Sequence, residues 1–429
     1  MGGSRSRDRG QGCSNKDALV KSIFPPSSIA LVNKSLSAVF ATGATLVATS
    51  LLFAQTAVMP AMPRPTTAAA LPMPVPAITA AAYLVVEATS GQVLAEANTK
   101  QRRDPASLTK LMTAYLVFDA LHQKQLTLSQ RLRVPERAWK AEGSRMFIEP
   151  GVPITTEDLL RGMIIQSGND AAIALAISVA GNESEFVSRM NREAKRLGMA
   201  DTQFLNPTGL TQQGHFSTAH DLAMLSLALM RDFPLYTKFY AEKSYTHNNI
   251  VQENRNRLLF TDPTVDGLKT GHTDAAGWCL ITTVNRPPRR LLTVLLGAPS
   301  EAARINESRK LIDWAFTAYE GRKLFEGGKA IQQLVVWKST VDSIPIGFRD
   351  DVTAVADAGK GADITTELTI PKPRIGPVTA GDTVGVLKVK RAGNLIYERD
   401  IVAMESAPGA PMWKRMWHSV VLTWKGFFK

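Results

Sequence analysis

A serine and a lysine three residues apart form the first pattern that could do chemistry, in Asp104-Pro-Ala-Ser-Leu-Thr-Lys110. Asp104 is a good N-cap and Pro105 suits the first helical position, so we expect Ser107 in the first turn of a helix. Free backbone N–H groups and the positive end of the helix dipole would face the atom that Ser107 attacks. Lys110 would lie on the same face, and a desolvated amine can accept the serine proton. Alone, the pattern would indicate an ordinary helix surface.

A second pattern, Gln166-Ser-Gly-Asn-Asp170, interrupts a helical region that opens with the capping box Thr155-x-x-Asp158. We expect Gly168 to permit a tight turn that presents the Ser167 hydroxyl and the Asn169 amide. A hydroxyl beside the nucleophile can pass a proton to a leaving amine, and an amide can hold a peptide backbone. A plain turn between two helices is the alternative.

A third pattern, Val265-Asp-Gly-Leu-Lys-Thr-Gly271-His-Thr, reads as a strand that ends in a turn. Lys269 and Thr270 could meet a carboxylate, and Gly271 would let a substrate backbone approach closely. The three patterns in this order are those of the penicillin-recognising serine enzymes.

Other residues that could do chemistry are weaker candidates. His220-Asp221 and His272 could suggest a Ser-His-Asp triad, but Lys110 already supplies a base. Metal ligands at close spacing are missing from the sequence, and no cofactor is expected. Cys279 lies in an apolar run and is expected in the core.

Several elements must position these residues. Residues 82–87 and 92–96 read as two strands joined by a hairpin, and apolar spacing of three and four predicts a series of helices. Strands return later, followed by one more helix, so both ends of a single α/β domain should complete one antiparallel sheet. The expected helices are 107–121, 155–180, 182–197, 219–230 and 303–319, and the later strands are 265–270, 277–284 and 290–297. Short β-rich runs at 333–337, 364–370 and 383–389 then predict a small all-β module.

The two ends of the chain carry targeting signals. Basic residues followed by an apolar stretch from Leu36 to Val58 predict a cleaved export signal, with an uncleaved membrane span as the alternative. At the other end, apolar and basic residues alternate at helical spacing, which favours a helix in a membrane interface over one docked on the protein. The apolar residues expected to contact lipid are Trp413, Trp417, Trp424, Phe427 and Phe428.

The composition sets wide limits. The chain has 429 residues, 45% of them hydrophobic, and a formal charge of +12. This length suggests two folded units, and the charge would suit an anionic polymer, anionic lipid or nucleic acid, or serve solubility alone. After signal cleavage, Cys279 would be the one remaining cysteine, so no internal disulfide could form.

From about residue 80 to the C-terminus the chain resembles the D-alanyl-D-alanine carboxypeptidases, low-molecular-weight penicillin-binding proteins of peptidase family S11. Besides the three motifs, the likeness rests on Gly143-Ser-Arg-Met-Phe147, Asn206-Pro-Thr-Gly-Leu210 and Asn254-Arg-Asn-Arg257. The resemblance implies a serine DD-peptidase/β-lactamase-like α/β (α+β) domain, an antiparallel sheet flanked by helices, then a small all-β domain and a C-terminal amphipathic helix. Together with the composition of the N-terminal part, this predicts a basic region and signal peptide (1–57), a Pro/Ala-rich linker (58–79), the catalytic domain (80–322), the β-rich domain (323–407) and the anchor helix (408–429).

The resemblance also implies roles for individual residues. Ser107 would be acylated by a peptidoglycan pentapeptide, or by β-lactam inhibitors, with Lys110 as the base and Ser167 as the proton relay. Asn169 would orient the peptide, and Lys269, Thr270, Gly271, His272 and Arg304 would bind substrate, with the backbone N–H groups of Ser107 and His272 as the oxyanion hole. The enzyme would lie on the periplasmic face of the bacterial inner membrane, act in peptidoglycan maturation and cell shape, and bind no nucleic acid.

Two other functions remain open. A class A β-lactamase shares the three motifs, but the chain has no Glu-x-x-Leu-Asn motif between Ser167 and Lys269. A catalytically silent envelope scaffold, which would use the β module to recruit partners, is the other alternative. D,D-endopeptidases also share the motifs but resemble a shorter chain without that module.

Overall fold

A computed structural model of the chain describes residues 73–427, and side chains as far as Trp424. The expected export signal and most of the expected linker lie outside the described residues, as do Phe428 and the side chain of Phe427.

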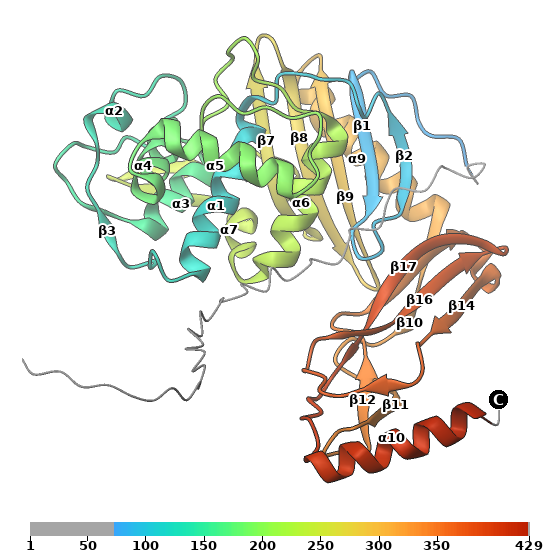
Figure 1. The fold of residues 1–429 in the computed structure, drawn as a ribbon. Coiled ribbons are helices and arrows are strands. Elements are labelled where there is room, and N and C mark those ends of the chain that lie inside the picture. The colour runs from blue at the N-terminus through green and yellow to red at the C-terminus, as the bar shows by residue number, and fades with distance from the viewer. Residues whose placement is uncertain (1–72, 428–429) are drawn as a thin grey trace, which may run out of the picture. The chain divides into compact units, whose positions relative to one another are not determined.

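The first folded region is built on an antiparallel sheet with strand order β2-β1-β9-β8-β7 (Figure 1). Ala82 on β1 pairs with Leu296 on β9, so strands from the two ends of the region lie side by side. This confirms the expected completion of one sheet by both ends of the domain. The strands are β1 (Ala82–Glu87), β2 (Val93–Ala97), β7 (Val265–Thr273), β8 (Gly277–Arg286) and β9 (Arg289–Ala298).

The helices of this region lie between β2 and β7, apart from one that follows β9. The larger ones are α1 (Lys110–His122), preceded by a 3-10 turn η1 (Ala106–Thr109), then α3 (Thr156–Ile164), α4 (Asn169–Ala180), α5 (Glu183–Arg196), α6 (Ala219–Asp232) and α9 (Glu301–Ala318). Thr155 is confirmed as the N-cap of α3, because its Oγ1 accepts a hydrogen bond from Asp158 N, while Asp158 Oδ2 accepts from the Thr155 hydroxyl rather than from the backbone N–H of a full capping box.

Shorter elements went unpredicted, because two to four residues are too few to show a period. They are β3 (Arg131–Leu132), α2 (Glu136–Trp139), β4 (Ile154–Thr155), η2 (Pro234–Tyr236), α7 (Lys238–Ala241), β5 (Ser244–His247), β6 (Ile250–Glu253) and α8 (Leu258–Thr261).

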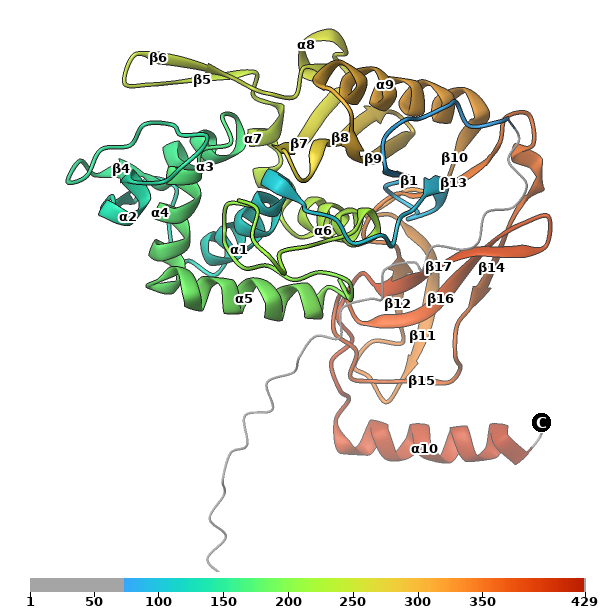
Figure 2. The same cartoon turned by 90° about the horizontal axis from the view of Figure 1, so that it is seen from above.

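Both faces of the sheet are covered, as Figure 2 shows, with α9 on one side and α1 and α6 on the other. Strand β9 shows why: Leu292 and Val294 belong to the core that includes α1 and α6, whereas Leu291 and Leu295 pack with residues of α9. Successive side chains of a strand point to opposite faces, so one apolar run serves two cores.

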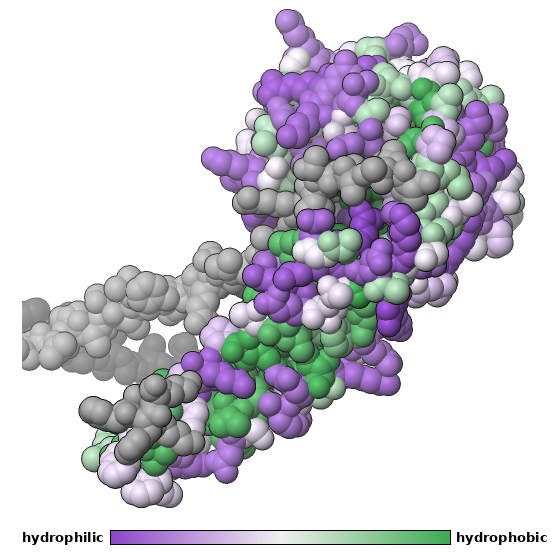
Figure 3. Space-filling view, turned by 90° about the vertical axis from the view of Figure 1, so that its right-hand side faces the viewer, coloured by the Kyte–Doolittle hydropathy of each residue, from purple (hydrophilic) through white to green (hydrophobic). Residues whose placement is uncertain are grey.

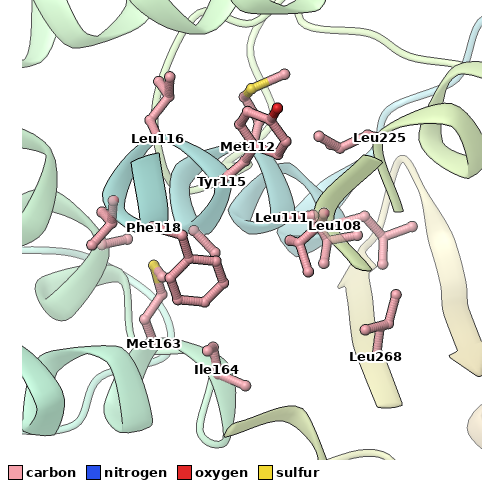
Figure 4. Close-up of a cluster of buried hydrophobic side chains, with 14 of the residues drawn as sticks. Leu108, Leu111, Met112, Tyr115, Leu116, Phe118, Met163, Ile164, Leu225 and Leu268 are labelled. Atoms are coloured by element: carbon pink, nitrogen blue, oxygen red, sulfur yellow. The ribbon is translucent and has the colours of Figure 1, made fainter. Parts of the chain in front are cut away.

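Helix α1 is buried almost all around, which fixes the residues at its N-terminal end. Figure 4 shows Leu108 and Leu111 beside Leu268 of β7, and Phe118 further along the helix near Met163. All these side chains are buried. Because a packed core resists displacement, the turn that carries Ser107 has a fixed position against β7.

The second folded region is the expected all-β module, with its own apolar core. Its larger sheet has the order β14-β16-β17-β12-β11-β15, and β10 pairs with β13. The elements are β10 (Tyr319–Phe325), β11 (Ala330–Trp337), β12 (Ser343–Gly347), β13 (Val352–Asp357), η3 (Gly361–Asp363), β14 (Ile364–Thr369), β15 (Arg374–Ile375), β16 (Thr383–Arg391) and β17 (Asn394–Ala403).

The chain ends in helix α10 (Met412–Phe427), as the spacing of its apolar residues predicted. Within residues 73–427, no helix combines the length and the apolar character that crossing a bilayer requires.

Candidate active site

Ser107 lies in η1, just before α1, and is partly exposed. The expected helix start differs in detail: Asp104 Oδ1 accepts a hydrogen bond from Ala106 N at 2.8 Å, and Ala106 has a φ of 46°. Asp104 therefore stabilises a tight 3-10 turn rather than capping α1 directly. The turn places Ser107 and Lys110 on the same side, as the spacing predicted.

The Lys110 amine is the centre of the site. It donates to Ser107 Oγ at 3.0 Å, to Asn169 Oδ1 at 2.6 Å and to the Thr208 carbonyl at 2.6 Å. Only 1% of the residue is exposed. Burial, reinforced by the positive charge of Arg255 and opposed by Asp170, lowers the pKa of Lys110 to about 7. A lysine with this pKa is neutral in a large fraction of molecules near neutral pH and can take a proton from Ser107.

The Thr208 carbonyl was not predicted as part of the site. Asn206 holds this loop, because its Oδ1 accepts hydrogen bonds from Thr208 N and from Gly209 N. Gly209 has a φ of 83°, and a Cβ there would lie 1.8 Å from the Ala106 carbonyl oxygen. Glycine is thus the residue that lets this loop reach η1, the turn that carries Ser107, which we call the nucleophile turn. The local signal was the Asn-Pro-Thr-Gly run, a turn-forming sequence.

Ser167 and Asn169 lie where α4 begins, as expected. The expected turn is present, but Ser167, with a φ of 67°, is the residue that adopts the left-handed conformation, whereas Gly168 has a φ of −58°. Gly168 is required for space, because a Cβ there would lie 2.7 Å from Asp170 Oδ1. The turn aims the Ser167 hydroxyl at Lys269, whose amine donates to it at 2.9 Å.

Lys269 on β7 is buried, and its amine also donates to the Thr270 carbonyl at 3.0 Å. Burial and the charges of three neighbouring cations hold the pKa of Lys269 well below its usual range. At Gly271, which was expected to let a substrate backbone approach, a Cβ would meet Pro105 O and Ala106 Cβ, both at 3.2 Å. The missing side chain lets η1 pack on β7.

The remaining predicted residues lie around the same end of β7. His272 stacks on Trp278, with ring centroids 3.9 Å apart, and the guanidinium of Arg304 lies 5.1 Å from the Trp278 ring. Arg304 is buried and paired with Glu301, and its Nε has no hydrogen-bond partner among the described residues. Thr270 is buried beside Lys269. Strand β7 is an edge of the sheet, so an extended peptide could lie along it.

The His220-Asp221 pair does not form a triad with Ser107. His220 Nδ1 lies 3.2 Å from Asp221 Oδ1, and the Ser107 hydroxyl interacts with Lys110 instead. His215, which was not predicted, is buried behind the nucleophile turn, where Nε2 lies 2.9 Å from Thr109 Oγ1. Cys279 is buried and free, as expected.

The sequence patterns thus converge in space. A serine beside a buried lysine base, and a second serine beside a second lysine on a sheet edge, form the arrangement of a serine acyl-transfer enzyme. The fold and the three motifs define the class of penicillin-recognising serine enzymes.

Comparison with known proteins narrows this class. Residues 66–300 match the D-alanyl-D-alanine carboxypeptidase family, and residues 319–408 match the C-terminal domain of penicillin-binding protein 5. The chain therefore belongs to the D-alanyl-D-alanine carboxypeptidase family. It is 36% identical over 361 residues to D-alanyl-D-alanine carboxypeptidase DacC of Escherichia coli, covering 82% of this chain and 90% of that protein.

Solved structures agree with this assignment. Penicillin-binding protein 5 from Haemophilus influenzae superposes with a TM-score of 0.68 and 34% identity, covering 78% of this chain and 99% of that one. Penicillin-binding protein D2 from Listeria monocytogenes, in its ampicillin-bound form, has a TM-score of 0.52 and 31% identity, covering 56% of this chain and 98% of that one.

Proposed function

We propose that the chain is a serine-type D-Ala-D-Ala carboxypeptidase, a hydrolase that removes the terminal D-alanine from peptidoglycan pentapeptides. Its membership of the carboxypeptidase family supports this activity. The observation that carries the chemistry is the contact of the buried Lys110 amine with Ser107 Oγ. A neutral amine at hydrogen-bond distance is the group that can activate the serine.

The reaction follows from this geometry in two halves. Ser107 Oγ attacks the carbonyl carbon of the penultimate D-alanine while Lys110 takes the hydroxyl proton. The C–N bond to the terminal D-alanine then breaks, and Ser167, supported by Lys269, passes its proton to the leaving nitrogen while the proton held by Lys110 restores the Ser167 hydroxyl. Water then attacks the ester carbonyl: its hydroxyl becomes part of the carboxyl group of the shortened peptide, its proton goes to Ser107 Oγ, and the peptide is released.

The remaining site residues bind the substrate. Asn169 orients the peptide backbone, and the backbone N–H groups of Ser107 and His272 stabilise the oxyanion. Lys269, Thr270 and Arg304 supply hydrogen-bond donors and positive charge for the terminal carboxylate, and Gly271 keeps β7 close to the nucleophile turn. β-Lactams acylate the same serine, in keeping with the ampicillin-bound relative from Listeria.

A direct test measures D-alanine released from a D-Ala-D-Ala pentapeptide and labelling by a fluorescent penicillin. Ser107→Ala should abolish labelling and lower release by a factor of about 10³ or more. Ser178→Ala, whose hydroxyl bonds the carbonyl of its own helix, is the matched control and should behave as wild type. Undiminished release by Ser107→Ala would contradict the proposal, and rapid turnover of penicillin would indicate a β-lactamase instead.

We also propose that the mature enzyme lies on the periplasmic face of the inner membrane, after export directed by residues 1–57. Helix α10 supports this proposal, because its apolar side is the exposed one: Trp413, Trp417 and Trp424 are 71%, 64% and 65% exposed. Its polar side contacts the β module, where Lys414 pairs with Asp342 and His418 Nδ1 accepts from Lys338 N. Figure 3 shows hydrophobic residues gathered in the lower part of the view, over the β module and α10. Phe427 and Phe428 would extend the lipid contact.

Truncation before Pro411 tests the membrane contact. The truncated mature protein should move from the membrane fraction to the soluble periplasm, whereas Lys414→Gln, which keeps the aromatic face, should stay largely with the membrane. Persistence of the truncated protein on membranes would favour an uncleaved N-terminal span, and an intact-mass measurement of the mature chain would show whether that segment had been removed.

We further propose that the linker is 58–79, the catalytic domain 80–322, the β-rich domain 323–407 and the anchor helix 408–429. The boundary after residue 322 falls within β10.

A further inference from the structure

A buried carboxylate next to the catalytic amide takes no part in the mechanism above. Asp170, the second residue of α4, is 1% exposed. Its Oδ1 accepts from Met146 N at 3.0 Å, and its Oδ2 accepts from Phe147 N at 2.9 Å and from Ile148 N at 3.3 Å. One side chain thus provides acceptors for three consecutive N–H groups of segment 142–148, which has no regular secondary structure.

The conformation of segment 142–148 depends on these contacts. Phe147 has a φ of 69°, a conformation that costs a bulky residue free energy and persists only where surrounding contacts impose it. The β5–β6 hairpin holds the segment from another side, because Gln252 Nε2 donates to Met146 O and Asn248 Nδ2 donates to Phe147 O. Asp170 and the hairpin together hold the segment in place.

The segment in turn holds the catalytic amide. Asn169 donates its backbone N–H to Ser144 O at 2.7 Å and its side-chain Nδ2 to Glu142 O at 2.6 Å, while its Oδ1 accepts from Lys110. The Asn169 amide therefore bridges segment 142–148 and the Lys110 amine. A displaced segment would move the group that orients both the base and the substrate peptide.

Asp170 also acts on the charge balance of the site. The charged groups around Lys110 are Arg255 in the loop before α8, Lys269 on β7 and Asp170 on α4, and Arg304 on α9 acts on Lys269. Among these charges, Arg255 favours the neutral form of the Lys110 amine. Asp170 acts in the opposite direction, toward the protonated amine.

We propose that Asp170 is a positioning residue for acyl transfer, which holds segment 142–148 against Asn169 and whose negative charge acts on the Lys110 amine. The proposal rests on the function proposed above. The carboxylate has two separable effects: it fixes the position of segment 142–148, and it influences the protonation of the Lys110 amine. Removing its charge alone would shift Lys110 toward the neutral form, whereas merely loosening the site would admit water and favour the protonated form.

The test compares Asp170→Asn with Asp221→Asn in the full-length mature protein. Asp221 is the matched control, because it is also buried in the first turn of a helix and also holds a loop, through Asp201 N and Thr202 Oγ1. The measurement is the second-order rate constant for acylation by a fluorescent penicillin, taken from about pH 5 to about pH 9. The acid limb, the part of this profile where the rate falls at low pH, reports the protonation of the base in the free enzyme. Rates are normalised to the fraction of sites that can be labelled.

We expect Asp170→Asn to acylate roughly tenfold or more slowly at its optimum, with the acid limb moved to lower pH by about half a unit or more. Asp221→Asn should keep the wild-type midpoint even if it is less stable. An acid limb of Asp170→Asn that stays in place or moves to higher pH would overturn the proposal. The acylation rate of the wild-type enzyme tests the proposed function by itself. A failure of that function would therefore appear in the wild type, whereas a failure of the Asp170 proposal would appear only in the comparison with the variant.

The double variant Asn248→Ala/Gln252→Ala covers the case in which Asp170→Asn does not fold. It removes both side-chain hydrogen bonds from the hairpin to segment 142–148 while leaving the carboxylate and its charge in place. We expect the KM for a D-Ala-D-Ala pentapeptide to rise roughly fivefold or more with the pH midpoint unchanged. A wild-type KM would show that the position of the segment does not matter and would overturn the positioning role.

Discussion

Lys269 Nζ donates a 2.9 Å hydrogen bond to Ser167 Oγ, although 102 residues separate the two along the chain. The contact joins the edge strand β7 to the turn before α4, so it exists only when sheet and helices are packed together. It pairs a hydroxyl that can relay a proton with a buried amine that can polarise it.

Ser167→Ala should therefore slow acylation by a pentapeptide by roughly 10²- to 10⁴-fold, because the leaving nitrogen loses its proton donor. Stopped-flow or quench measurements of the acylation step would show this. Ser226→Ala, which removes a buried hydroxyl that bonds the Leu222 carbonyl within α6, should retain the wild-type rate. A similar loss in both variants would contradict the relay role.

The pKa of Lys110, lowered to about 7 by burial, predicts how the acylation rate depends on pH. The amine is protonated and inactive as a base below that pH and neutral above it, so the rate should fall as pH drops through about 7. Lys110→Arg should lose acylation at every pH, since a guanidinium does not give up its proton in this range. A flat wild-type profile between pH 6 and 8 would contradict this assignment of the base.

Gly209→Ala should be far more damaging than Gly214→Ala. Both glycines have positive φ values, 83° and 89°, so both variants incur the backbone cost of a left-handed conformation, about 1–2 kcal/mol. The added methyl at 209 would also lie 1.8 Å from the Ala106 carbonyl, whereas at 214 the nearest atom is 3.5 Å away. We expect a clearly larger drop in Tm and slower acylation for Gly209→Ala, and equal effects would show that the loop need not approach the nucleophile turn.

Burial lowers the pKa of His215 to about 4, which links folding to pH. Between that value and the ordinary 6.5, the unfolded chain binds a proton that the folded chain does not. Stability should thus rise with pH across this window, by up to about 3 kcal/mol, and be fully present above it. His215→Gln should show a smaller difference in Tm between pH 5 and pH 7 than wild type, and an unchanged difference would rule out His215 as the source.

Much of the architecture could be predicted because it rests on local patterns. The period of apolar residues predicted α1, α5, α6 and α9 and the strands of the main sheet, with ends that differ by a few residues. The N-cap at Thr155 needs only four neighbouring residues, and it was found as predicted. The identities of Ser107, Lys110, Ser167 and Lys269 follow from motifs of a few residues each, so they could be read directly.

Tertiary structure alone decided what these residues touch. The Thr208 carbonyl at Lys110 and the Asp170 contacts with segment 142–148 join residues far apart in the chain, and a backbone carbonyl carries no side-chain signature. The glycines show the same limit: the sequence predicted a tight turn at Gly168 and substrate access at Gly271, but the space that each leaves for a neighbouring group is visible only in the fold. A motif determines which chemical groups are present, but distances, burial and charge, and therefore the pKa of Lys110, depend on how distant segments pack.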